Sequence, residues 1–105
     1  MARTPITIRH DPEQHRLEAV LEDGEVAGYS QYHVLSDDTW SFFHTEVDDR
    51  YEGQGIGSQL AGGVMDFLRD HGLRIDPRCE FLHSYMAGHE ETQDLLAPGV
   101  SLKGA

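Results

Sequence analysis

A glycine-rich stretch near the middle of the chain joins a strand-like run to a helix-like run. It reads RYEGQGIGS from Arg50 to Ser58, between strand-like residues 40–47 and helix-like residues 56–71. Glycines let the backbone approach a ligand closely, and the first N–H groups of a helix have no partner within that helix. Such a turn is typical of an anion site. A phosphate-bearing ligand is therefore the first functional hypothesis.

The glycine spacing narrows the choice of phosphate ligand. A Walker loop requires Lys and then Ser or Thr after its last glycine, but Ile56 and Gly57 follow Gly55. The dinucleotide fingerprint G-x-G-x-x-G fits only in its first half, because position 58 is Ser. The spacing that fits is R-x-x-G-x-G, from Arg50 to Gly55. The alternative is a helix cap and turn that bind nothing, since short patterns often match by chance.

Further residues on both sides of the loop complete a longer pattern. His-Thr-Glu-Val at residues 44–47 precedes it, and Pro-Arg-Cys at residues 77–79 follows it, with Tyr85 and His89 beyond. With the R-x-x-G-x-G spacing, this order resembles the short single-domain branch of the GNAT acyltransferase superfamily. The resemblance covers about residues 18–96.

That resemblance implies a single N-acetyltransferase-like domain over residues 1–105, which binds acetyl-CoA and moves its acetyl group to an amine. The sequence departs from the branch at Glu80, Glu90 and Thr92, where Pro or an aromatic residue is usual. The resemblance also implies that the glycine loop holds the CoA pyrophosphate on its backbone N–H groups, with Arg50 near the phosphates. The implied CoA contacts are Val47, Arg50, Glu52, Gly53, Gln54, Gly55, Ile56, Gly57 and Ser58.

Apolar periodicity predicts an α/β (α+β) fold in which antiparallel strands precede a glycine-led helix. The expected strands are residues 6–10, 16–21, 25–35 and 39–47. A helix, a strand and a C-terminal helix are expected next, at residues 56–71, 73–75 and 81–86, with a further turn to residue 96. This is the order of the GNAT fold without the helices that usually follow its first strand, so the resemblance implies an open acceptor site.

His44 and Glu46 are candidate catalytic bases. They are two residues apart on an expected strand, so their side chains share one face. An attacking amine needs a free lone pair, and either side chain can take its proton, directly or through water. An imidazole titrates close to neutral pH without any tuning. The alternative for His44 is a packed, hydrogen-bonded strand residue.

Cys79 and Tyr85 are the other two catalytic candidates. Cys79 follows Pro77 close to an expected helix N-terminus, which favours a reactive thiolate, and the resemblance places it near the thioester. Whether it acts as a nucleophile stays open, and a small buried packing residue is the alternative. The resemblance implies that Tyr85 protonates the departing thiolate, and an ordinary half-buried aromatic residue is the alternative.

The charge balance bears on the choice of partners. Nineteen acidic residues against eight basic ones give a net charge of -11 with His neutral. Nucleic acid would be repelled, whereas a cationic amine acceptor, either a small molecule or a protein, would be attracted. Alternatively, the charge serves only to keep a small protein soluble. Two further functions stay open, namely a CoA-binding module without turnover and a small acidic interaction domain.

Targeting and metal patterns are also informative. No run is apolar enough to span a bilayer, and residues 1–5 lack an apolar signal region. The one Cys cannot form an intrachain disulfide, which suits a reducing compartment. These features predict a cytoplasmic protein without a membrane partner. Because H-x-x-x-H and C-x-x-C pairs are absent from the sequence, no metal is expected.

Overall fold

Alternating side chains in the first half of the chain form most of a five-stranded sheet. The computed structural model describes residues 3–102. Its strands are β1 (Thr7–Asp11), β2 (Arg16–Val20), β3 (Val26–Ser36), β4 (Thr39–Val47) and β5 (Arg74–Pro77). They lie in chain order across the sheet, with β1 to β4 antiparallel and β5 parallel to β4. The expected antiparallel meander followed by a later strand is confirmed.

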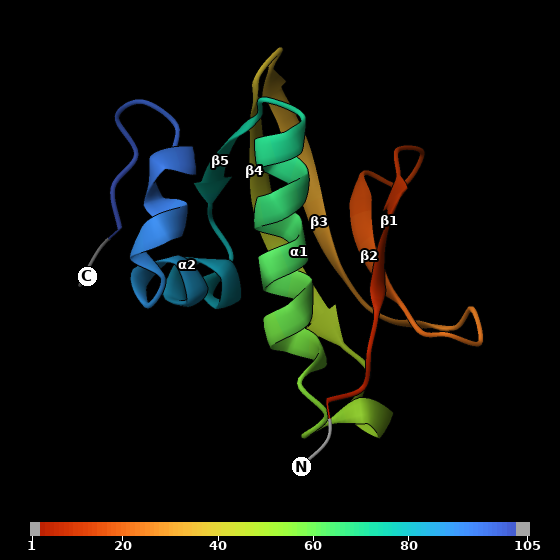
Figure 1. Ribbon diagram of the computed structural model, residues 1–105. Coiled ribbons are helices and arrows are strands. Elements are labelled where there is room, and N and C mark those ends of the chain that lie inside the picture. The colour runs from red at the N-terminus through yellow and green to blue at the C-terminus, as the bar shows by residue number, and fades with distance from the viewer. Residues whose placement is uncertain (1–2, 103–105) are drawn as a thin grey trace.

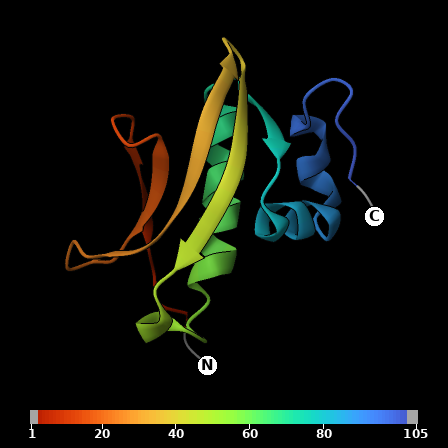
Figure 2. The ribbon, with the colours of Figure 1, turned by 180° about the vertical axis from the view of Figure 1, so that it is seen from behind.

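Helices pack on only one face of this sheet. The α-helices are α1 (Ile56–Asp70) and α2 (Glu80–Ala87), and the 3-10 helices are η1 (Asp49–Tyr51) and η2 (Glu90–Leu95). Figure 1 shows α1 lying across the sheet, with β5 and α2 beside it. Figure 2 shows the opposite face, over which none of the described helices lies. We call these the helix-covered face and the uncovered face.

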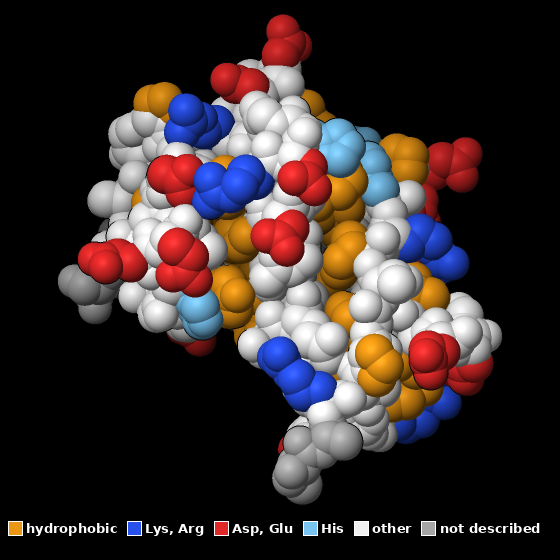
Figure 3. All heavy atoms as spheres, viewed as in Figure 1, with side chains coloured by type: hydrophobic (Ala, Val, Ile, Leu, Met, Phe, Trp, Pro, Cys, Tyr) orange, Lys and Arg blue, Asp and Glu red, His pale blue; other side chains and the backbone are white. Residues whose placement is uncertain are grey.

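The core lies between α1 and the helix-covered face. Leu60, Val64 and Leu68 recur at helical spacing on α1, and all three are fully buried. They belong to one cluster with Leu17 of β2 and Phe42 of β4. Each buried side chain of this size contributes about 1.5–3 kcal/mol to folding. Away from the core, acidic side chains are spread over this side of the molecule with basic side chains among them (Figure 3).

The sequence predicted the bounds of β4 as they are found, and those of the other elements to within one or two residues. Local features that were not predicted include a 3-10 helix and a β-bulge next to the candidate site residues. The 3-10 helix η1 precedes the glycine loop. In β4, the pairing steps from His44 with Gln31 to Phe42 with Tyr32, so Phe43 is an extra residue that forms a β-bulge.

Candidate active site

The glycine loop ends at an uncapped helix N-terminus. Gly53 and Gly55 have φ angles of 81° and 76°, in the left-handed region that glycine enters without steric cost. Gly55 is the N-cap of α1 and provides no side-chain cap. The first-turn N–H groups therefore have no intrahelical acceptor, and they lie at the positive end of a 15-residue helix. Residues 52–58 thus lie together in a geometry that suits an anion.

Arg50 is bound to carboxylates in this structure. Its guanidinium lies 3.0 Å from a carboxylate oxygen of Asp48 and 3.5 Å from one of Glu25. Asp48 also accepts a hydrogen bond from the Arg50 backbone N–H and caps η1. Hydrogen bonds from Arg50 hold the pKa of the Asp48 carboxyl below its usual value. The expected contact between Arg50 and phosphates stays a prediction, and in this structure the side chain is bonded to Asp48 and Glu25.

The N-terminal segment of the described chain lies against the glycine loop (Figure 1). The Thr4 backbone N–H donates to the carbonyl of Gln54 at 3.1 Å, and the Gln59 amide donates to the Thr4 carbonyl at 2.6 Å. The Thr4 hydroxyl is also hydrogen-bonded to the Gln54 side chain. Arg3 lies over Gly55, where an added Cβ would be 3.2 Å from its Nε atom. Sequence reasoning missed this segment, since no local pattern pairs residue 4 with residue 54.

Half of β4 is unpaired on the side of β5. The β4–β5 pairing ends at Phe42 with Pro77, and the Phe42 carbonyl accepts hydrogen bonds from the N–H groups of Arg78 and Cys79, both at 2.9 Å. Beyond that point, within residues 3–102, residues 43–47 have no β5 partner because the chain turns into α2. An unpaired strand edge offers backbone groups to an extended ligand.

Cys79 is the N-cap of α2, so the predicted place near a helix N-terminus is confirmed. Its side chain is 8% exposed. The sulfur lies 3.3 Å from the Thr45 hydroxyl, which is 2.8 Å from the Ser30 hydroxyl, so a polar chain links α2, β4 and β3. Burial agrees with the packing alternative and is unfavourable for rapid reaction with external reagents.

His44 and Glu46 share one face of β4, as the strand periodicity predicted. The His44 ring nitrogen lies 3.1 Å from a Glu46 carboxylate oxygen. The Tyr29 hydroxyl donates to the same carboxylate at 3.5 Å. Both side chains of the pair are exposed, 47% and 60% respectively. They lie on the uncovered face, opposite to Thr45 and its contact with Cys79.

Tyr85 lies apart from both groups. Its hydroxyl is 3.2 Å from the Cβ position of Gly62 on α1, and its ring stacks on His89 with centroids 3.8 Å apart. Burial, followed by the carboxylates of Glu91 and Asp66, raises the pKa of Tyr85 above its ordinary value of 10.0. The phenol therefore stays protonated at neutral pH. The structure does not bring it to the thiol or to the His44–Glu46 pair.

Phe81 is a candidate contact that sequence reasoning missed. It is 41% exposed, and its ring lies 3.0 Å from the Cβ position of Gly57, which has Val47 3.8 Å away. These three residues place an apolar surface beside the first turn of α1. The only sequence signal is that Phe81 precedes Tyr85 by four residues, so both project from one side of α2.

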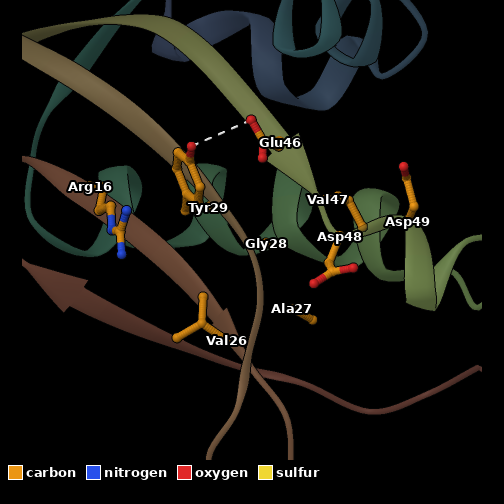
Figure 4. A pocket seen from close by; sticks show the side chains of 9 residues that line it. All are labelled: Arg16, Val26, Ala27, Gly28, Tyr29, Glu46, Val47, Asp48 and Asp49. Atoms are coloured by element: carbon orange, nitrogen blue, oxygen red, sulfur yellow. Dashed lines mark hydrogen bonds between the residues drawn. The ribbon is translucent and has the colours of Figure 1, made fainter.

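A cavity of about 540 Å³ opens where β2, β3 and β4 meet the start of η1. Figure 4 shows the Glu46, Asp48 and Asp49 carboxylates around it, with the Tyr29 hydroxyl directed at Glu46. The Arg16 guanidinium lies over the Tyr29 ring, 4.5 Å from its centroid. The lining is Arg16, Val26, Ala27, Gly28, Tyr29, Glu46, Val47, Asp48 and Asp49.

Among residues 3–102, no three His, Cys, Asp or Glu side chains gather in a way that could hold a metal ion. None of the helices described here is long and apolar enough to cross a membrane.

The chain is similar in sequence to known proteins of about its own length. Protein NATD1 of Mus musculus is 27% identical over 82 residues, which are 78% of this chain and 74% of the relative. Protein NATD1 of Homo sapiens is also 27% identical over 82 residues, or 78% of this chain and 73% of the relative.

Solved structures share the fold at low identity. A solution structure of a GCN5-like protein from Staphylococcus aureus matches with a TM-score of 0.65 and 20% identity, over 99% of this chain and 97% of that one. Ard1 from Thermoplasma volcanium matches with a TM-score of 0.53 and 18% identity, over 73% of this chain and 55% of that one. An aminoglycoside acetyltransferase from an uncultured soil metagenomic sample matches with a TM-score of 0.52 and 20% identity, over 82% of this chain and 60% of that one.

The family match covers most of the chain. The model of the GCN5-related N-acetyltransferase family matches residues 16–95, which include β2 to β5, the glycine loop, α1 and α2. The chain belongs to the GCN5-related N-acetyltransferase family.

Proposed function

We propose that this protein binds acetyl-CoA and transfers the acetyl group to an amine. The observation with most weight is that the family match over residues 16–95 includes a glycine loop at an uncapped helix N-terminus. Donors without intrahelical partners, aligned with a helix dipole, are what a pyrophosphate requires.

In this proposal the cofactor lies on the helix-covered face. Backbone N–H groups of residues 52–58 bind the pyrophosphate, and Arg50 supports the loop through Asp48. The pantetheine arm follows the unpaired edge of β4, where its amides meet the free backbone groups of residues 43–47. Val47 and Phe81 supply the apolar contact at the entrance to this edge.

The acceptor amine approaches from the uncovered face. Glu46, or His44 beside it, takes a proton from the ammonium form so that the nitrogen has a lone pair. The nitrogen attacks the thioester carbonyl carbon, the new C–N bond forms, and the C–S bond breaks so that the sulfur leaves as a thiolate. The nitrogen loses its extra proton, which the thiolate takes up to give free CoA. The carboxylates of Glu46, Asp48 and Asp49 around the cavity favour a cationic acceptor.

Cys79 and Tyr85 have narrower roles. The buried thiol lines the path of the thioester, either as a packing group or as a transient acetyl carrier. Tyr85 has a raised pKa and so is a proton donor at neutral pH. Its present contact with α1 means that it reaches the thiolate only if α2 shifts when CoA binds.

The test combines binding and turnover in the same protein. We expect acetyl-CoA to raise the melting temperature, since a ligand that binds only the folded state stabilises it. Release of free CoA is then followed with a panel of polyamines, aminoglycosides and lysine-containing peptides. Turnover with at least one polycationic amine, and slower turnover with amines that carry a single positive charge, is the expected result. Absence of a thermal shift would exclude the acetyl-CoA proposal and leave the interaction domain.

A CoA-binding module without turnover is the second candidate. It is favoured by one observation, namely that Tyr85 contacts α1 while Cys79 contacts β4 and the His44–Glu46 pair lies on the other face. A thermal shift with CoA, together with no acetyl transfer to any amine of the panel, would establish this candidate instead.

A further inference from the structure

The arginines of the chain differ in how they are paired. Arg9, Arg16, Arg50, Arg69 and Arg78 each form a salt bridge with a carboxylate. Arg74 donates to the backbone carbonyl of Asp94 at 2.7 Å. Arg3 has no carboxylate within salt-bridge distance among residues 3–102, although the whole chain carries a net charge of -11.

Arg3 occupies a place where a lone cation is unfavourable. Its Nε atom would lie 3.2 Å from a Cβ at Gly55, the N-cap of α1. The N-terminal end of a helix is partly positive, so a nearby guanidinium is repelled unless an anion lies between them. The exposed Arg3 side chain, which has no carboxylate partner among residues 3–102, thus lies beside the N-cap of an uncapped helix. An anionic ligand there would be attracted by both.

The backbone of the same segment is fixed to the loop. Thr4 makes hydrogen bonds with Gln54 on one side of Gly55 and with Gln59 on the other. Arg3 is therefore held beside the loop by the residue that follows it in sequence. Less side-chain freedom is lost on binding when the backbone is already positioned.

We propose that Arg3 is the cation that binds the pyrophosphate of CoA, whereas Arg50 has a structural part in bracing the loop through Asp48 and Glu25. This assignment rests on the proposed function, and it adds a residue from outside the matched residues 16–95 to the cofactor site. The planar guanidinium can donate two parallel hydrogen bonds to phosphate oxygens, which a lysine cannot reproduce.

The test measures CoA affinity by calorimetry for wild type, Arg3→Ala, Arg3→Lys and Arg69→Ala. Arg69→Ala is the matched control, because it removes the same charge from the opposite end of α1. Arg3→Ala should weaken CoA binding by about tenfold or more, Arg3→Lys by less, and Arg69→Ala by less than about twofold. Equal effects of Arg3→Ala and Arg69→Ala would overturn the assignment. Circular dichroism melts establish that each variant is folded.

Two further measurements show which phosphate of CoA Arg3 contacts, and whether Arg3 or Arg50 binds the pyrophosphate. Dephospho-CoA keeps the pyrophosphate and lacks the 3′-phosphate, so Arg3→Ala should cost the same factor with either ligand. A cost seen only with CoA would assign Arg3 to the 3′-phosphate and contradict the proposal. Arg50→Ala should weaken CoA binding less than Arg3→Ala, and the reverse order would return the role to Arg50. If wild type itself binds neither ligand, the proposed function fails before Arg3 is tested.

Discussion

The two faces of the sheet differ in how their side chains are held. On the helix-covered face, Thr45 is bonded to Ser30 and to the buried thiol of Cys79. On the uncovered face, the neighbouring residues His44 and Glu46 are exposed and are bonded mainly to each other. Alternation along three residues of β4 thus separates a packed environment, on the face where we propose that the cofactor binds, from an open one. The comparison suggests that acetyl donor and amine approach β4 from different sides.

Two carboxylates on the uncovered face also differ in how they are paired. Glu18 is 2% exposed and is bound by both Arg9 and Arg16. Glu46 is exposed and has only His44 and the Tyr29 hydroxyl as partners. A fully paired carboxylate has a structural part, whereas the exposed one can exchange protons with a substrate.

The largest effect is expected from the His44–Glu46 pair. If Glu46 or His44 is the base, its replacement by Gln should lower turnover by roughly 10²–10⁴-fold with little change in CoA affinity. Steady-state kinetics on His44→Gln and Glu46→Gln measure the loss of turnover for each residue. Glu18→Gln is the matched control, and it should lower the free energy of unfolding by about 1–3 kcal/mol without lowering turnover of the folded protein. Losses of only a few fold in both Gln variants would make this face structural.

The next largest effect concerns the glycine loop. Gly55→Asp places a carboxylate next to Arg3 and in front of the helix N-terminus, so CoA affinity should fall by roughly 100-fold. Gly72→Asp is the control for backbone strain, since Gly72 has a φ of 66° just beyond the other end of α1. Each variant should lose about 1 kcal/mol of stability. Isothermal titration would contradict the loop assignment if both variants bound CoA as wild type does.

A smaller effect is expected at Cys79. Because the thiol is buried against Thr45, we expect direct transfer, and Cys79→Ala should reduce turnover by only a few fold. Mass spectrometry after mixing with acetyl-CoA should then find no acetyl group on the protein. Near-complete loss of turnover together with an acetylated Cys79 would show a covalent route and move the thiol from the packed environment into the reaction.

The smallest effect is a pH dependence of stability at His10. Burial, and then repulsion from His71, lowers the pKa of His10 from 6.5, although Asp11 partly opposes this. The unfolded state therefore binds a proton more readily, so this contribution to stability is complete above pH 6.5 and is lost as pH falls through the lowered folded value. Between pH 7.5 and pH 5, the melting temperature of wild type should fall more steeply than that of His10→Asn. A control, His33→Gln, should follow wild type.

Periodic patterns explain how much was predictable. A turn signal at residues 36–38 placed β4 at residues 39–47, strand periodicity put His44 and Glu46 on one face, and helical spacing placed the start of α1 at Ile56. These features depend on residues close in sequence. The bulge at Phe43 depends on the register between two strands, so no local pattern revealed it.

The proposed site residues that sequence reasoning missed are brought together from distant segments. Arg3 meets Gly55, and Phe81 meets Gly57, only because the chain packs as it does. That Tyr85 protonates the CoA thiolate stays a prediction, and in this structure its hydroxyl lies beside α1. The orientation of α2 decides that contact, and sequence spacing within α2 cannot specify it. Cys79 is the intermediate case, since its place at a helix start was predicted and its burial was not.

The most direct test of the central claim is a titration of isotope-labelled protein with CoA, followed by two-dimensional NMR. If the cofactor binds on the helix-covered face, the backbone amide signals of residues 52–58 and of Thr45 should shift most. Signals of Arg9 and Glu18 on the uncovered face should stay in place. Shifts confined to the uncovered face, or no shifts at saturating CoA, would contradict the account.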